Sequence, residues 1–215
     1  MSCQDNTNII NEVNKLSITI LSDSDTWMNR FVSGIQTVLC EKGHLVNWVH
    51  RPDDVPEGDL LYLLSCGQIV KKEVLQRNRN NLVVHASALP KGKGWSPLTW
   101  QILEGASEIP LTLFEAKEQV DSGAIYLQEA ISFAGHELID ELRNKLADCI
   151  VRMCCHFVEK YPEILKTAQS QNGTDSFYKK RRPEDSRLDP NQTIAEQFNL
   201  LRIVDNERYP AFFEL

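Results

Sequence analysis

Short apolar runs alternate with amphipathic stretches along most of the chain. The runs combine β-branched and aliphatic residues and end in turn-forming residues, which predicts strands. These strands are expected at 17–21, 45–49, 60–65, 81–85, 109–114 and 124–133. The i, i+4 spacing of Trp27, Phe31 and Ile35 predicts a helix that ends near Gly43. Further helices are expected at 71–77, from Pro97 onward, at 137–160 and in the tail from 194.

The order of these elements predicts an α/β fold with one open, mainly parallel sheet covered by helices on both faces. A strand, a helix and a second strand in succession form a right-handed parallel unit. The segment 60–65 is apolar without alternation, as in strands that are covered on both faces. Ligands of such sheets bind beyond the carboxyl ends of the strands. His85 follows one predicted strand and 65–67 follows another, so we expect a site there.

The chain divides near residue 166. Residues 1–166 contain all the predicted strands and the longest helix, whereas 167–192 is polar and basic without an apolar period. Residues 194–215 regain a helix and end in aromatic side chains. We therefore expect one domain at 1–166 and a short C-terminal extension at 167–215.

The overall charge limits the classes of partner. The 215 residues carry a formal net charge of -7, so a protein-wide attraction to nucleic acid is not expected. A local basic run from Lys179 to Arg182 remains able to contact a phosphate. No apolar stretch approaches the roughly 20 residues of a membrane span, and residues 1–14 lack an apolar signal core. These features predict a cytoplasmic protein without a membrane or nucleic-acid partner.

Cysteine spacing and glycine motifs exclude several kinds of site. The six cysteines form no C-x-x-C pair and no histidine completes a zinc pattern, so we expect reduced thiols and no metal. Neither G-x-G-x-x-G nor G-x-x-x-x-G-K-[ST] occurs, which argues against a dinucleotide or nucleoside triphosphate cradle of the usual kind.

Two ionisable residues stand in loops rich in turn formers. His85 opens the segment His85-Ala-Ser-x-Leu-Pro-x-Gly-x-Gly94, and Asp121 lies 36 residues after it in Val120-Asp121-x-Gly123. Each one alone is typical of a structural histidine or of a turn aspartate. Together with Leu64-Ser-Cys-Gly67-Gln-Ile69 and Trp95-Ser-Pro97, they resemble the folate-dependent formyltransferases. That group includes methionyl-tRNA, glycinamide-ribotide and nucleotide-sugar N-formyltransferases.

The resemblance implies transfer of a formyl group from 10-formyltetrahydrofolate to an amine, without a metal. The attacking amine sheds a proton and the tetrahedral species carries an oxyanion. His85 would accept the proton or hold the oxyanion. Asp121 would orient His85, stabilise its charged form or relay the proton. The resemblance further implies that the folate contacts Leu64, Cys66, Gly67, Ile69, Ser87, Val120 and Asp121.

One position departs from the family pattern. The family usually carries Asn two residues before the histidine, where its amide helps to hold the formyl oxygen, whereas this chain has Val83. Asn81 lies a further two residues back, about 6.6 Å along a strand, which is too far for a simple replacement. Ser87, the loop amides or a bound water remain as donors. Loss of one such donor typically raises the activation free energy by about 2.7–4 kcal/mol. Either another group therefore replaces this donor, or the reaction is slow.

The tail resembles that of one subgroup. Segments 176–189 and 201–213 are similar to small bacterial nucleotide-sugar N-formyltransferases that act on UDP-linked 4-amino-4,6-dideoxy sugars in surface-glycan or nonulosonic acid biosynthesis. Basic side chains offer phosphate donors, and aromatic side chains offer stacking surfaces. The extension would thus close the sugar-nucleotide site. The expected contacts are Lys91, Lys93, Gly94, Trp95, Tyr178, Lys180, Arg181, Arg182, Arg187, Arg202, Asn206 and Tyr209.

Two alternatives stay open. In the first, the acceptor is another amine, such as glycinamide ribotide or an aminoacyl group, although the short tail and negative charge disfavour tRNA. In the second, Val83 marks a non-catalytic module that binds folate or a nucleotide sugar. A homodimer is the default expectation for such enzymes.

Overall fold

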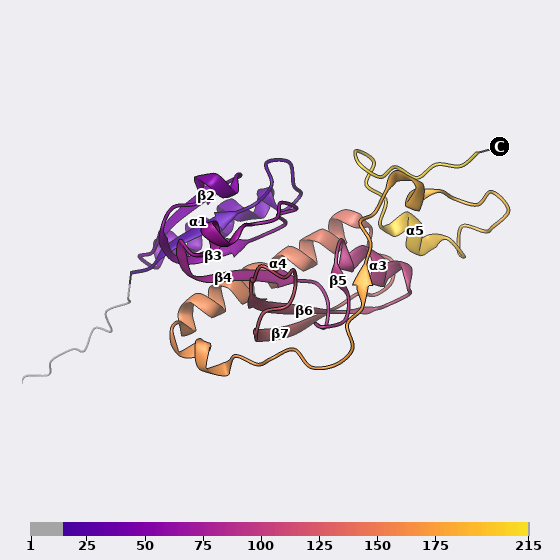
Figure 1. The fold of residues 1–215 in the computed structure, drawn as a ribbon. Helices are drawn as coiled ribbons and strands as arrows, with labels where there is room; N and C mark the ends of the chain where they lie inside the picture. The colour runs from indigo at the N-terminus through magenta and orange to yellow at the C-terminus, as the bar shows by residue number, and fades with distance from the viewer. Residues whose placement is uncertain (1–14, 215) are drawn as a thin grey trace, which may run out of the picture.

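A six-stranded sheet forms the centre of the computed structural model, which describes residues 15–214 (Figure 1). The polar segment 1–14, in which no signal core was found, lies outside the described residues. The strands of the sheet are β1 (Ser17–Leu21), β2 (Leu45–Val49), β3 (Gly58–Leu63), β4 (Asn78–His85), β6 (Glu108–Glu115) and β7 (Ile125–Ser132). Their order is β2-β1-β3-β4-β6-β7, and only β6 runs against its neighbours. The predicted open, mainly parallel sheet is confirmed.

Helices cover both faces of the sheet, but unequally. The helices are α1 (Asn29–Glu41), α2 (Lys72–Leu75), α3 (Pro97–Leu103), α4 (Ile139–Lys160) and α5 (Phe198–Arg202). Apolar residues of α1, α3 and α4 form one large core with the side chains of one sheet face. On the other face, Leu21 and Leu61 form a smaller cluster with Val55, which follows the 3-10 turn η1 (Pro52–Asp54), and with Val74 of α2. Partly buried side chains packed against this cluster are Val49, Leu63, Cys66 and Val70. The predicted helix end at Gly43 is confirmed by its φ of +91°.

Three predicted elements differ from the structure. Strand β3 stops at Leu63 because Ser65 adopts a left-handed φ of +52°, which ends the extended backbone. The helix expected at 137–160 begins at Ile139, and Leu138 just before it is 51% exposed. The tail helix is shorter than expected and is limited to α5.

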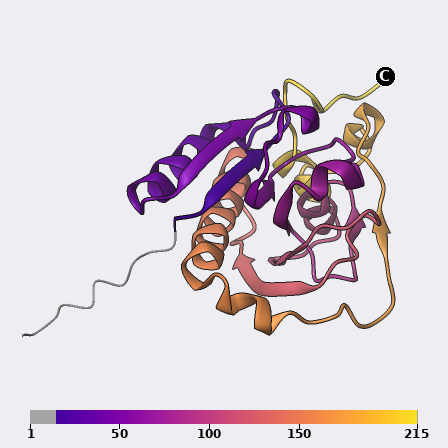
Figure 2. The same ribbon diagram turned by 60° about the vertical axis from the view of Figure 1, so that its left-hand side comes forward.

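The extension returns to the edge of the sheet. After α4 and the 3-10 turn η2 (Glu163–Thr167), Gln169 pairs with Ile125, and the chain then runs beside β5 (Figures 1 and 2). There β8 (Phe177–Tyr178) forms a parallel pair with β5 (Lys93–Gly94), which the polar sequence of the tail did not predict. A last 3-10 turn, η3 (Pro183–Ser186), precedes α5.

Two ion pairs, one buried and one half-buried, fasten the end of the tail to the domain. Arg202 Nη2 lies 3.4 Å from Glu137 Oε2, and Arg143 Nη2 lies 2.6 Å from Asp205 Oδ2. Glu137 lies just before α4, and Arg143 lies within it. The tail is therefore held by this helix, on the side of the main core. Within residues 15–214, no helix is both long and apolar enough to span a membrane.

Candidate active site

His85 is the last residue of β4 and stands at the carboxyl edge of the parallel strands. Its partner in the antiparallel pair with β6 is Thr112, and its side chain is only 9% exposed. The ring Nε2 lies 2.8 Å from the carbonyl oxygen of Gly92. A carbonyl oxygen can only accept, so Nε2 carries the hydrogen and Nδ1 is the basic nitrogen of the neutral ring. The loop that follows β4 therefore fixes the tautomer of His85.

Asp121 lies in the turn between β6 and β7 and faces His85. Its Oδ2 is 4.0 Å from His85 Nε2 and accepts a hydrogen bond of 2.8 Å from the Gly94 amide. The backbone of Asp121 has φ +52°, a left-handed conformation that aspartate adopts more readily than most residues. At Gly123 a Cβ atom would lie 1.6 Å from the carbonyl oxygen of Glu115, so only glycine permits this turn. The turn thus places the two residues predicted to be catalytic in one buried pair.

The loop after β3 carries several of the residues predicted to bind folate. Asp23, which follows β1, accepts hydrogen bonds from the Gly67 amide at 2.8 Å and from the Gln68 side chain at 2.9 Å. A Cβ atom at Gly67 would lie 3.3 Å from the Trp95 ring, so glycine allows the two loops to meet closely. Ile69 is 78% exposed, which leaves an aliphatic side chain on the surface of this loop.

Three other predicted folate contacts have different environments. Leu64 packs inside the main core, so its side chain cannot line an open pocket, contrary to the prediction. Burial raises the pKa of the Cys66 thiol, which is therefore neutral at pH 7. Val120 is 58% exposed on the loop that carries Asp121.

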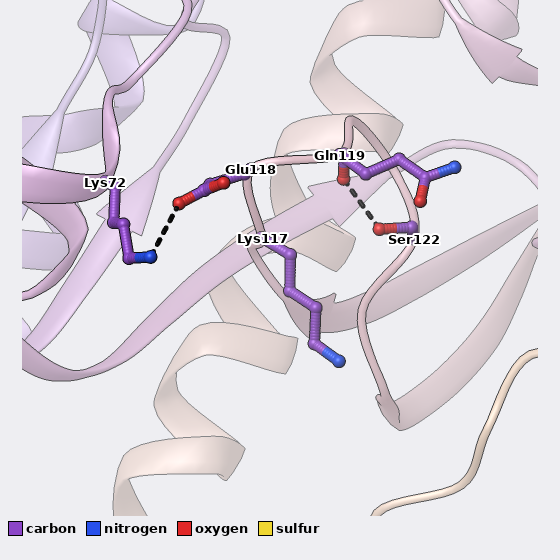
Figure 3. Close-up of a pocket in the computed structure, with 5 residues that line it drawn as sticks. All are labelled: Lys72, Lys117, Glu118, Gln119 and Ser122. Carbon is purple, nitrogen blue, oxygen red and sulfur yellow. Dashed lines mark hydrogen bonds and ion pairs between the residues drawn. The ribbon is translucent and has the colours of Figure 1, made fainter.

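An open groove of about 520 Å³ borders the Asp121 turn. The residues that line it are Lys72 at the start of α2 and Lys117, Glu118, Gln119 and Ser122 from the β6–β7 turn (Figure 3). Lys72 Nζ lies 3.4 Å from Glu118 Oε1, and this pair joins the two walls. Figure 3 shows Lys117 extending away from the other residues drawn, with no interaction to any of them. No motif in the sequence marked any of these five residues as part of a site.

On the opposite side, the tail places exposed cations beside the loop that follows His85. Lys180 Nζ lies 4.8 Å from the centre of the Trp95 ring, a cation–π distance. Lys91 and Arg182 are exposed. Arg187 is exposed but pairs with Glu214 at 3.0 Å. Six of the residues predicted to bind substrate are exposed: Lys91, Trp95, Lys180, Arg182, Arg187 and Asn206.

Other residues predicted to bind substrate have structural partners instead. The guanidinium of Arg202 is buried and bonded to the carbonyl and carboxylate oxygens of Glu137. Arg181 is buried and donates to the carbonyl oxygen of Ile203 and to the Ser186 hydroxyl. Neither side chain reaches a ligand at the surface, so both predictions are revised.

The other side chains predicted to bind substrate also interact with residues of the protein itself. Lys93 is buried and pairs with Asp175 at 2.8 Å, so its ammonium is not free for a phosphate. The Tyr178 hydroxyl donates to Glu104 at 2.7 Å, and burial with this carboxylate raises the pKa of Tyr178 to about 12. The Tyr209 ring lies under the Arg181 guanidinium, 5.2 Å from its centre. The rings of Tyr178 and Tyr209 therefore pack against other residues of the protein.

No direct replacement for the missing asparagine stands out among the donors proposed for it. The Gly94 amide is taken by Asp121, and the Gly92 amide donates to the Ser176 hydroxyl at 2.8 Å. The Ser87 hydroxyl has no hydrogen-bond partner within residues 15–214, but it is fully buried. His85 itself, when doubly protonated, is the remaining charged donor at this position.

The site also contains residues that the sequence did not reveal. Gln171 donates to the carbonyl oxygens of Asp121 and Gly123, at 3.0 and 2.9 Å, and so supports the catalytic turn from the tail. Asp175 and Ser176 bind the loop after β4. All three belong to a polar stretch without a period, and only Ser176 lies in a segment that the resemblance marked, at its first position.

Comparison with known proteins agrees with this architecture. The family described as "Formyl transferase" matches residues 53–156. Among curated relatives, the methionyl-tRNA formyltransferase of Thermodesulfovibrio yellowstonii is 26% identical over 141 residues, which are 65% of this chain and 46% of that protein. The chain spans about half the length of such relatives.

Solved structures share the fold at low sequence identity. A methionyl-tRNA formyltransferase from Clostridium thermocellum superposes with a TM-score of 0.77 at 20% identity, covering 93% of this chain and 88% of the other. WlaRD, described as a sugar 3N-formyl transferase in the presence of dTDP and 5-N-formyl-THF, gives a TM-score of 0.67 at 17% identity, covering 92% and 82%. The predicted fold is confirmed: the chain has the Rossmann-like α/β fold of the formyltransferases, and its residues 53–156 match that family.

Proposed function

We propose that this protein transfers the formyl group of 10-formyltetrahydrofolate to the amine of a UDP-linked 4-amino-4,6-dideoxy sugar. The observation that carries the proposal is the buried pair of His85 and Asp121 at the carboxyl edge of the sheet, with Nε2 and Oδ2 4.0 Å apart. Solvent-poor pairs of an imidazole and a carboxylate are suited to proton transfer near neutral pH.

The residues around the groove fit a folate co-substrate. Its two bordering loops each expose an aliphatic side chain, Ile69 three residues before Lys72 and Val120 beside Asp121. These side chains provide apolar contact for a flat ring. The ammonium groups of Lys72 and Lys117 provide positive charge at the same groove. The glutamate end of a folate carries carboxylates, which such ammonium groups attract.

His85 and Asp121 would manage the proton that the attacking amine sheds. The bound folate would supply the formyl group: the formyl carbon exchanges its bond to folate N10 for a bond to the acceptor nitrogen, and N10 receives the proton that the acceptor sheds. With its Nε2 hydrogen held by the Gly92 carbonyl, neutral His85 would take up the proton at Nδ1. The Asp121 carboxylate, 4.0 Å from Nε2, would stabilise the imidazolium that results. The same imidazolium would offer a charged donor in place of the amide that Val83 lacks.

The tail supports a nucleotide-linked acceptor. Lys180 stacks on Trp95 beside the loop that contacts His85, and Arg182 is exposed two residues further along. Two cations and an exposed indole suit a diphosphate attached to a sugar and a base. In a chain with a net charge of -7, this local cationic surface favours a specific anion over a long polyanion.

A second acceptor class is favoured by the curated relatives. Those compared above are methionyl-tRNA formyltransferases, which makes an aminoacyl-tRNA the competing acceptor. Glycinamide ribotide is a third amine. A purely binding role for folate or a nucleotide sugar is the alternative without catalysis.

Mass spectrometry of the acceptor after incubation with 10-formyltetrahydrofolate separates these possibilities. The acceptors are a UDP-4-amino-4,6-dideoxy sugar, glycinamide ribotide and methionyl-tRNA. We expect a gain of one formyl group on the sugar nucleotide alone. Formylation of methionyl-tRNA or of glycinamide ribotide in preference to the sugar would replace the proposed acceptor. Folate binding without transfer to any acceptor would favour the binding module.

Paired variants test the role of the tail. Arg182→Gln removes an exposed guanidinium, and we expect KM for the sugar nucleotide to rise about tenfold with little change in KM for folate. Lys166→Gln is the matched control, because Lys166 is exposed just before the tail and pairs only with Glu163 among the described residues. An equal response of the two variants would argue against phosphate binding by Arg182.

A further inference from the structure

One peptide unit of the loop after β4 lies between His85 and the tail. Its carbonyl oxygen, on Gly92, accepts the hydrogen of His85 Nε2 at 2.8 Å. Its amide, on Lys93, donates to the carbonyl oxygen of Ser176 at 2.9 Å. Because a peptide unit is planar and rigid, the tail bond on one side sets the direction of the carbonyl on the other.

The side chain of Ser176 fixes the preceding peptide unit as well. Its hydroxyl accepts a hydrogen bond of 2.8 Å from the Gly92 amide. Ser176 therefore binds the amides on both sides of Gly92, through its hydroxyl and through its carbonyl oxygen. A Cβ atom at Gly92 would lie 2.9 Å from Ser87 Cβ and 3.0 Å from the Tyr178 ring, so the loop is enclosed here.

The next residues of the loop alternate between the tail and Asp121. The amide of Trp95 donates to the Tyr178 carbonyl at 3.1 Å, whereas the Gly94 amide points the other way, to Asp121 Oδ2 at 2.8 Å. The ion pair of buried Lys93 with Asp175 adds a side-chain bond between the same two segments. Both partners of the catalytic pair thus rest on a loop whose other edge is held by residues 175–178.

We infer that Ser176 is a positioning residue for His85, acting through the two peptide units that meet at Gly92. It touches no reacting group. Its carbonyl oxygen holds the peptide unit whose carbonyl selects the Nε2–H tautomer of His85, and its hydroxyl holds the preceding peptide unit. The inference rests on the proposed function only for its kinetic consequence. The tautomer of His85 is a property of the folded chain and is measurable without any substrate.

The structural test is nitrogen-15 NMR of histidine-labelled protein, with the His85 signals assigned by loss in His85→Gln. In the wild type we expect Nε2 to be protonated and Nδ1 to be unprotonated. Ser176→Ala frees the Gly92 amide but keeps the backbone bond from the Lys93 amide, so the peptide unit before the Gly92 carbonyl loses its support and we expect a mixture of the two tautomers. Ser176→Thr, which keeps a hydroxyl, should restore the wild-type pattern. Ser170→Ala is the matched control, because Ser170 is an exposed tail serine.

The kinetic test compares kcat with KM for both substrates. Displacements well below 1 Å suffice to slow a reaction, so we expect kcat of Ser176→Ala to fall about tenfold while both KM values change less than about twofold. A raised KM for the acceptor with unchanged kcat would make Ser176 a substrate contact and overturn the inference. An unchanged tautomer and unchanged kcat would overturn it too.

A second variant covers the case in which Ser176→Ala does not fold. Asp175→Asn leaves both Ser176 bonds to the loop but weakens the ion pair with Lys93, and the same mixed tautomer is expected to a smaller degree. If the wild type transfers no formyl group, the proposed function fails, but the NMR comparison still decides whether Ser176 positions His85. A wild-type His85 protonated at Nδ1 would contradict the inference directly.

Discussion

The two sides of the His85–Asp121 pair are built differently. On the side of α2 and the β6–β7 turn, an open groove of about 520 Å³ exposes Lys117, and Ile69 and Val120 are exposed on the loops that border it. On the side of the tail, the amides of the loop after β4 are bonded to residues 176–178. This difference indicates two roles. The open side offers a surface to a ligand, and the closed side fixes the positions of His85 and Asp121.

The largest effect is expected where the two sides meet. His85→Asn removes the basic nitrogen while keeping a polar side chain, and general acid–base catalysis is typically worth 10²–10⁴-fold. We expect kcat to fall about 10³-fold with KM for both substrates nearly unchanged. His136→Asn, at an exposed histidine, is the control and should behave like the wild type. A His85→Asn enzyme with more than a tenth of wild-type activity would exclude catalysis by this residue.

The next largest effect is expected at the buried ion pair between Glu137 and Arg202, which holds the tail. Glu137→Gln leaves the buried Arg202 guanidinium without its countercharge, and breaking such a pair costs about 3 kcal/mol of unfolding free energy. Denaturation by urea measures this loss. Glu159→Gln breaks an exposed pair with Lys42 and should cost less than about 1 kcal/mol. Equal losses in the two variants would show that the buried anchor contributes no more than a surface pair.

The stability from Glu137 should depend on pH. Burial raises its pKa, but the Lys145 ammonium and the amides of Ala134 and Gly135 outweigh this effect and lower the pKa below its usual range. A lowered folded pKa gives stability that is present above the unfolded pKa, about 4.3, and is lost as the pH falls toward the folded value. The difference between wild type and Glu137→Gln should therefore shrink below about pH 4. A constant difference from pH 7 to pH 3 would contradict the lowered pKa.

Asp121→Asn should have a smaller effect than loss of the histidine. Asparagine tolerates the left-handed backbone and still accepts the Gly94 amide, so the turn should persist. Loss of the charge beside the imidazolium is expected to reduce kcat about 10²-fold. An Asp121→Asn enzyme with wild-type kcat would make Asp121 a structural residue only.

The smallest effect is expected at the open groove. Lys117→Gln should raise KM for 10-formyltetrahydrofolate about threefold at low salt, since exposed charge contacts are typically worth about 0.2–1 kcal/mol. The effect should weaken as salt increases and leave kcat unchanged. Lys71→Gln, at an exposed lysine just before α2, is the control. A change in KM for the acceptor instead would indicate that the acceptor, and not the folate, binds at this groove.

The sequence predicted the sheet better than the site. The apolar runs at 17–21 and 45–49 coincide with β1 and β2, because buried strands leave a local pattern of side chains. His85 and Asp121 were found through their motifs, and the structure brings them together. Arg181 and Arg202 were misjudged, because a basic residue in a polar segment gives no sign that it is buried against a carbonyl or a carboxylate.

The role of the tail was beyond local patterns. Strand β8 has only two residues, Phe177 and Tyr178, and its partner β5 lies more than 80 residues earlier. Hydrogen bonds between backbones this far apart depend on the folded chain and not on side-chain periodicity. Ser176 opens the segment 176–189 that the resemblance marked, but nothing in the sequence indicated that it holds the peptide unit whose carbonyl contacts His85.

The most direct measurement follows the formyl carbon itself. Carbon-13 NMR of a reaction with 10-[¹³C]formyltetrahydrofolate and a UDP-4-amino-4,6-dideoxy sugar reports where the label goes. We predict that the label appears as a formamide on the sugar nitrogen, and that this signal is lost with His85→Asn but kept with His136→Asn. Label that stays on the folate or is released only as formate would contradict a sugar N-formyltransferase built on the His85–Asp121 pair.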